Sequence, residues 1–164
     1  MINIFEGKDA TIISGITDYT WMQLLSETGS DLTKWPTEKH FTSWLGLSPG
    51  QNNSGKMRRN AKKRGRPKAG QIFRTIAQSL INSKNVAIGS FGRRLRGRKG
   101  PGIAIKAMAR KLAVLYWRVM VKGLDYAEKG ITHYEEQIMA NKLKTFNRLA
   151  AELNVKIPEY VEIA

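Results

Sequence analysis

The sequence predicts an all-α protein, because apolar residues recur at spacings of three and four and strand-like alternation is scarce. Glycines also stand where several of the helical patterns stop. The chain has 164 residues, of which 41% are hydrophobic, enough for one domain with a core and an appendage. It contains no cysteine, which excludes disulfides, thiolate metal sites and cysteine nucleophiles. We find no membrane-length apolar run and no signal peptide, so we expect a cytoplasmic protein.

The N-terminal part predicts two helices. A turn at Gly15 is followed by a helix over 19–28, with Asp18 as its N-cap and Gly29 at its end. A second helix is expected to begin near Pro36, which suits a first helical turn. Its inward-facing residues are predicted to be Phe41, Trp44, Leu45 and Leu47. A helix, a Gly-Ile turn and a helix indicate either a degenerate helix-hairpin-helix, whose turn amides bind phosphate, or an ordinary helical hairpin.

The middle of the chain alternates between loops and helices. Residues 48–69 are rich in glycine, proline, asparagine and charge, and predict a long loop. After Gly70 a helix is predicted from apolar residues at helical spacing: Ile72, Phe73, Ile76, Leu80 and Ile81. Another helix is expected over 86–95, before a basic stretch broken by glycines.

Two strong helical patterns complete the chain. Residues 103–122 predict a helix that ends at Gly123, with an apolar face of Ile105, Met108, Leu112, Leu115, Trp117 and Met120. Residues 132–153 predict a long amphipathic helix that carries Met139, Leu143, Phe146, Ala150 and Leu153. Such a helix requires a partner surface, either on its own chain or on a second protomer. We therefore expect a domain over 1–130 and a helical tail over 131–164.

The positive charge is concentrated in one region. The net charge is +15, and residues 39–124 contain 21 Lys and Arg and no acidic residue. The remainder carries 7 basic and 13 acidic residues, a balance of −6. A solvated surface would mix the two signs, so this segregation predicts nucleic acid as the partner. An anionic membrane or a ribosome-like structural role is the alternative.

Two clusters of cations are the candidate phosphate-binding residues. The first lies on the predicted loop, where glycines would let the side chains follow a phosphate backbone; a localisation signal or a solubility loop is the alternative. It comprises Lys56, Arg58, Arg59, Lys62, Lys63, Arg64, Arg66 and Lys68. The second is dominated by arginine, which favours bidentate contacts, with Phe91 and Leu95 as its anchors to the core. It comprises Arg93, Arg94, Arg96, Arg98 and Lys99.

Candidate catalytic groups are few. No set of carboxylates or histidines has the spacing of a metal site, and Met57 stands where a nucleotide-binding loop requires Ser or Thr. Ser54 is the remaining candidate nucleophile. Gly55 would give it freedom to approach a phosphate in line, and Lys56, Arg58 or Arg59 would stabilise the developing charge. The alternative is a turn serine that caps its neighbour.

Several stretches together resemble a known family. They are the glycine turn at Gly15, the segment 27–29, SWLGLSPG at 43–50, SGK at 54–56, and the ARKL-containing segment 97–126. In combination they resemble the C-terminal, serine-bearing domain of the bridge-RNA-guided insertion-sequence transposases, a family that includes the Piv-like DNA invertases. The resemblance runs from about residue 11 to 130. Thr17 replaces the usual glycine of the hairpin turn, and SGK replaces the frequent SGGK.

The resemblance implies a function that the charge pattern alone does not specify. By its motif, Ser54 matches the family's serine, which is thought to join the DNA strand covalently. The partners implied are DNA, a guide RNA and an acidic RuvC-like domain. That domain would hold divalent metal such as Mg²⁺. That acidic domain is missing from this chain, which we therefore expect to be a fragment or a truncated copy that binds nucleic acid without recombining it. A nucleoid-associated protein of a bacterium or archaeon is implied. The alternatives are a non-catalytic RNA- or DNA-binding structural module and a protein that oligomerises through 132–153.

Overall fold

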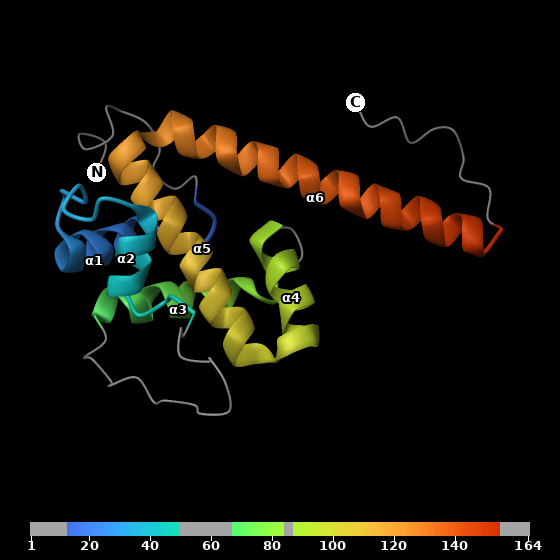
Figure 1. Cartoon of the computed structure of the whole chain (residues 1–164), viewed down its shortest axis with the longest axis horizontal. Coiled ribbons are helices and arrows are strands. Elements are labelled where there is room, and N and C mark those ends of the chain that lie inside the picture. The colour runs from blue at the N-terminus through green and yellow to red at the C-terminus, as the bar shows by residue number, and fades with distance from the viewer. Residues whose placement is uncertain (1–12, 50–66, 84–86, 155–164) are drawn as a thin grey trace, which may run out of the picture. The chain divides into compact units, whose positions relative to one another are not determined.

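A computed structural model describes residues 13–49, 67–83 and 87–154. The described residues form six α-helices and no β-strand, which confirms the predicted all-α class (Figure 1). The chain divides into two compact units, Met1–Glu128 and Lys129–Ala164. Helices α1 to α5 belong to the first unit, and α6 begins in the first and continues through the second.

The first two helices begin at threonines rather than at the residues that the sequence indicated. The N-cap of α1 (Asp18–Thr28) is Thr17, whose hydroxyl accepts a hydrogen bond from the Thr20 backbone N–H at 3.3 Å, so the prediction of Asp18 as the cap was wrong. Asp18 instead occupies the first turn, where a carboxylate stabilises the helix dipole. Gly29 ends the helix with φ +78°, as predicted. Helix α2 (Glu38–Trp44) begins after Thr37, two residues beyond Pro36.

Helices α3 and α4 extend further than predicted. Helix α3 (Lys68–Leu80) begins two residues before Gly70, which is therefore a helical residue and not the end of a loop. Helix α4 (Ala87–Lys99) continues through the basic stretch that the sequence assigned to a glycine-broken segment. Gly92 is buried in α4, where an added methyl group would collide with the sulfur of Met108. The helix therefore requires a small residue at this position, which explains a glycine inside it.

Helix α5 (Pro101–Lys122) is the centre of the first unit, and it packs against α2, α3 and α4 (Figure 1). The fully buried ring of Tyr116 on α5 contacts Trp21, Phe41 and Phe73, with ring centroids 4.8, 6.1 and 5.7 Å away. Its hydroxyl lies 3.1 Å from the buried hydroxyl of Thr28, so neither polar group lacks a partner. Burial raises the pKa of Tyr116 to about 12, against the smaller effect of the Thr28 hydrogen bond. Aromatic packing around one helix thus joins four helices into one core.

Helix α6 (Leu124–Glu152) is longer than the predicted 132–153 segment, because it begins directly after the positive-φ residue Gly123 that ends α5. Its large apolar side chains are exposed. Met139, Leu143, Phe146, Leu149 and Leu153 are between 45% and 72% exposed. Of the stripe that the sequence predicted, Met139, Leu143, Phe146 and Leu153 are therefore exposed, whereas Ala150 is buried.

Candidate nucleic-acid interface

Most of the first predicted cluster falls outside the described residues. That part comprises Lys56, Arg58, Arg59, Lys62, Lys63, Arg64 and Arg66, and the candidate nucleophile Ser54 lies outside the described residues as well. Lys68, the last member of the cluster, lies in the first turn of α3. The described part of the candidate interface therefore begins with the residues on either side of the segment 50–66.

The residues on the two sides of segment 50–66 are in contact, because the residues directly after α2 pack against the first turns of α3. A methyl group added at Gly70 would collide with the carbonyl oxygen of Leu45, so the two backbones are in direct contact. The guanidinium of Arg74 donates a hydrogen bond to the carbonyl oxygen of Gly46 at 3.2 Å. Leu47 and Ala69 are buried on the two sides of this contact. We call the contact between residues 45–47 and 69–74 the stem, because these residues flank segment 50–66 in the sequence.

All five members of the second cluster lie on α4, but they have different surroundings. Arg93 is half-buried, and its guanidinium donates hydrogen bonds to the carbonyl oxygens of Ile81, at 3.2 Å, and Ser83. A further bond reaches the hydroxyl of Ser90 at 3.3 Å. These bonds connect α4 to the end of α3, so Arg93 has a structural role in the fold.

The other four cations of α4 are exposed to solvent: Arg94, Arg96, Arg98 and Lys99. Arg94 and Arg98 are four residues apart and therefore share one face of the helix. Arg96 donates a hydrogen bond to the side chain of Asn82 at 3.4 Å. The basic residues of the last turn are stabilised by the C-terminal end of the helix dipole, and α4 carries no acidic residue. The result is a cationic surface on a rigid element.

Helix α5 continues the positive charge beside α4. The ammonium of Lys111 lies over the ring of Phe91 on α4, 4.4 Å from its centroid, in a cation–π contact. Phe91 and Leu95 are partly buried against the core, which confirms their predicted role as anchors of the basic helix. The α4 surface is therefore fixed to α5 by apolar contacts, and its exposed cations need not take part in the packing.

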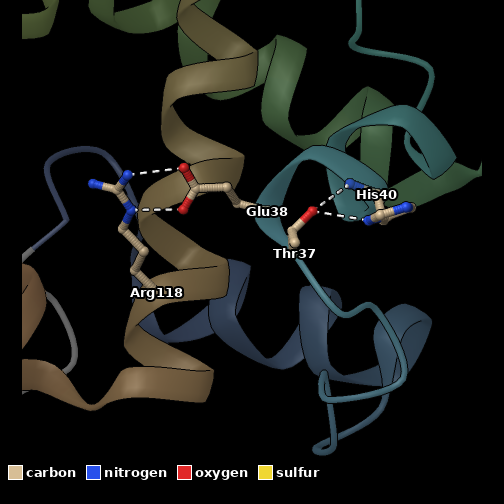
Figure 2. Close-up of polar contacts among 4 residues, drawn as sticks. All are labelled: Thr37, Glu38, His40 and Arg118. Atoms are coloured by element: carbon tan, nitrogen blue, oxygen red, sulfur yellow. Dashed lines mark hydrogen bonds and ion pairs between the residues drawn. The ribbon is translucent and has the colours of Figure 1, made fainter.

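The carboxylate of Glu38 is neutralised by an arginine. The guanidinium of Arg118 on α5 donates two hydrogen bonds to this carboxylate in the first turn of α2, from Nε and from one terminal nitrogen, each 2.9 Å long (Figure 2). The hydrogen bonds of Arg118 lower the pKa of Glu38, and the same contact raises the pKa of Arg118. This bidentate ion pair holds α2 to α5, and because its two charges cancel, Arg118 adds little to the positive potential of the region.

The structure also exposes one aromatic side chain that the sequence had assigned to the interior. Trp44 was predicted to face inward, but it is 39% exposed at the last turn of α2. Its ring centroid lies 4.7 Å from that of the partly buried Trp35. His40, one helical turn before Trp44, is exposed and lies 2.8 Å from the Thr37 hydroxyl through Nδ1 (Figure 2). The four-residue spacing of His40 and Trp44 is the sequence signal that places both on one face of the helix.

Within the described ranges, no three His, Asp or Glu side chains are arranged so that they could hold a metal ion. Among the helices described here, none has the length and apolar character needed to cross a membrane.

A comparison with protein-family models gives one match. The model described as "Transposase IS116/IS110/IS902 family" matches residues 10–91, half of the chain. The matched range contains α1 to α3 and the segment with Ser54, and it ends two residues before Arg93. Comparisons with curated proteins and with solved structures give no match.

Proposed function

The chain belongs to the IS116/IS110/IS902 transposase family, and from this premise we propose that it is a DNA-binding domain that supplies the nucleophile Ser54 for strand exchange. The observation that carries the proposal is the exposed cationic face of α4, in a region of 86 residues without a carboxylate. A protein that neutralises several phosphates gains affinity by releasing the counterions of the nucleic acid. The cations of the segment 56–68 would add further phosphate contacts. A guide RNA would bind through the same chemistry.

In the proposed reaction, the hydroxyl oxygen of Ser54 attacks a phosphorus atom of the DNA backbone. A bond forms between the serine oxygen and phosphorus while the bond from phosphorus to one deoxyribose oxygen breaks. The serine proton is released, and the departing oxygen takes up a proton. Lys56, Arg58 and Arg59 would stabilise the charge that develops on the phosphate. Divalent metal would be supplied by an acidic RuvC-like domain and would activate the phosphate.

The contribution of α4 is tested by replacing Arg94 and Arg98 with alanine and measuring duplex affinity by fluorescence anisotropy over a range of salt concentrations. If both side chains contact phosphates, the slope of log K against log salt should become less negative by about 2. The matched control replaces Lys142 and Lys144 on α6, two exposed lysines, which removes the same charge. An equal change of slope for the two double variants would show that only net charge matters, and would remove the assignment to α4.

The role of Ser54 is tested separately, in the recombining assembly with the acidic domain present. Ser54→Ala should abolish covalent protein–DNA adducts on denaturing gels while leaving duplex affinity unchanged. Ser43→Ala, at an exposed serine of α2, is the control and should leave adduct formation intact. Adducts that persist in Ser54→Ala would assign the nucleophile to another residue. Binding without any adduct in the unmodified protein would favour the alternative, a non-catalytic nucleic-acid-binding module.

A further inference from the structure

We propose that Trp44 and Trp35 form a stacking platform for an unpaired base of a DNA strand. The inference rests on the proposed DNA binding and specifies what this part of the surface recognises. The platform lies at the last turn of α2, directly before Leu45, whose backbone contacts Gly70 in the stem. Leu45 precedes Ser54 by nine residues, so a base on the platform would bind close in the sequence to the candidate nucleophile.

The geometry of the platform suits stacking. The ring of Trp44 packs against two other aromatic rings. Its centroid lies 4.7 Å from that of Trp35 and 6.1 Å from that of the fully buried Phe41. The backbone carbonyl of Trp35 accepts a hydrogen bond from Trp117 Nε1 at 3.2 Å, and its indole packs against the ring of Phe41, 5.0 Å between centroids. A large aromatic ring that is rigid and 39% exposed loses little conformational entropy when a ligand covers it.

The charges around the platform favour a nucleotide over an apolar protein segment. The ammonium of Lys34 lies 4.4 Å from the centroid of Trp35 and donates a hydrogen bond to the carbonyl oxygen of Thr28 at 2.7 Å. His40 shares the Trp44 face of α2. Of the two nearby carboxylates, Glu38 is paired with Arg118, and Asp31 accepts hydrogen bonds from Thr33. The exposed ring of Trp44, with the Lys34 ammonium over the neighbouring Trp35 ring, matches a base with its phosphate.

An unpaired base is required because the faces of bases within a duplex are covered by their neighbours. Stacking on an aromatic side chain is accordingly a means of binding single strands, and it tolerates any sequence because every base has a π-face. A transposase breaks and rejoins strands, so unpaired bases arise next to the exchange point. These considerations favour a single DNA strand at this surface.

The test compares an oligothymidylate with an abasic deoxyribose-phosphate strand of the same length, which has the same phosphates but no bases. The full chain should bind oligothymidylate at least about fivefold more tightly, the lower end of the effect of one stacked base. Trp44→Leu should remove this preference without changing the affinity for the abasic strand, and Trp44→Phe should retain most of it. Met22→Ala, at an exposed apolar side chain of α1, is the control and should leave the preference intact.

Equal affinity of the unmodified chain for the two strands would overturn the platform, as would a preference that survives Trp44→Leu. Tighter Trp44-dependent binding of oligouridylate than of oligothymidylate would overturn the choice of DNA. If Trp44→Leu fails to fold by circular dichroism, photocrosslinking of the unmodified chain to a 5-iodouracil strand gives the answer, since the adduct must map to Trp44 or Trp35. Absence of salt-dependent binding to either strand would instead reject the proposed function itself.

Discussion

Replacing Gly70 with alanine should destabilise the protein, although a Gly→Ala change within a helix ordinarily stabilises it by about 0.5–1 kcal/mol. The added methyl group would collide with the carbonyl oxygen of Leu45 and lie 3.3 Å from its carbonyl carbon and 3.6 Å from its Cα. These are backbone atoms, which cannot turn aside as a flexible side chain can. The added methyl group therefore forces α3 and the backbone at Leu45 apart. Overpacking of this kind costs about 1–3 kcal/mol. After subtraction of the helix-propensity gain, we expect a loss of about 1–2 kcal/mol in the free energy of unfolding.

The measurement is urea and thermal unfolding followed by circular dichroism, with a melting point lowered by about 2–8 °C. Gly97→Ala is the matched control, because Gly97 is also helical but an added methyl group would have no atom within 4 Å. We expect this variant to be more stable than the unmodified protein, by up to about 1 kcal/mol. If Gly70→Ala proved as stable as Gly97→Ala, the close contact between Gly70 and Leu45 in the stem would be refuted.

Three other predictions concern the core, the ion pair and α6. Glu38→Gln should cost about 1 kcal/mol at neutral pH, discounted for partial exposure. Because the folded pKa of Glu38 is lowered, this difference should be fully present above the ordinary pKa near 4.5 and be lost as pH falls through the lower folded pKa, which urea titrations at several pH values would show. For Tyr116, whose pKa is raised to about 12, stability should fall between pH 10 and 12, and Tyr116→Phe should remove that part of the pH dependence. We propose that the exposed stripe of α6 supports homo-oligomerisation. Replacing Leu143 and Phe146 with glutamate should then lower the particle mass measured by analytical ultracentrifugation. An unchanged mass would count against this proposal.

Local sequence patterns were sufficient to predict much of the fold. Apolar spacing predicted a helix for most of α5, and Gly29 and Gly123 were correctly taken as helix ends, because both adopt a positive φ that favours glycine. The errors arose where contacts distant in sequence override local preference. The helix after Gly70 was expected to begin later than it does, and the helix with Gly92 to end earlier, but each glycine lies inside a helix at a close contact, with Leu45 and Met108 respectively. Nothing in the neighbouring sequence shows such a contact.

The candidate site was predictable in composition but only partly in geometry. The segregation of charge pointed to the cations of α4 as candidates. It did not show that Arg94 is exposed whereas Arg93 is bonded to the carbonyl oxygen of Ser83, ten residues earlier. Trp44 was predicted to be buried because it is large and apolar. The packing of Trp35 and Phe41 leaves it at the surface instead. The role of Ser54 and the contacts of the loop cations remain predictions, since residues 50–66 lie outside the described part of the chain.

The most direct test of the account is the salt dependence of duplex DNA binding by the unmodified 164-residue chain. If about six cations contact phosphates, the slope of log K against log salt should be near −5. A slope near zero, or no measurable binding at low salt, would contradict the claim that the concentrated positive charge of this protein serves to hold nucleic acid.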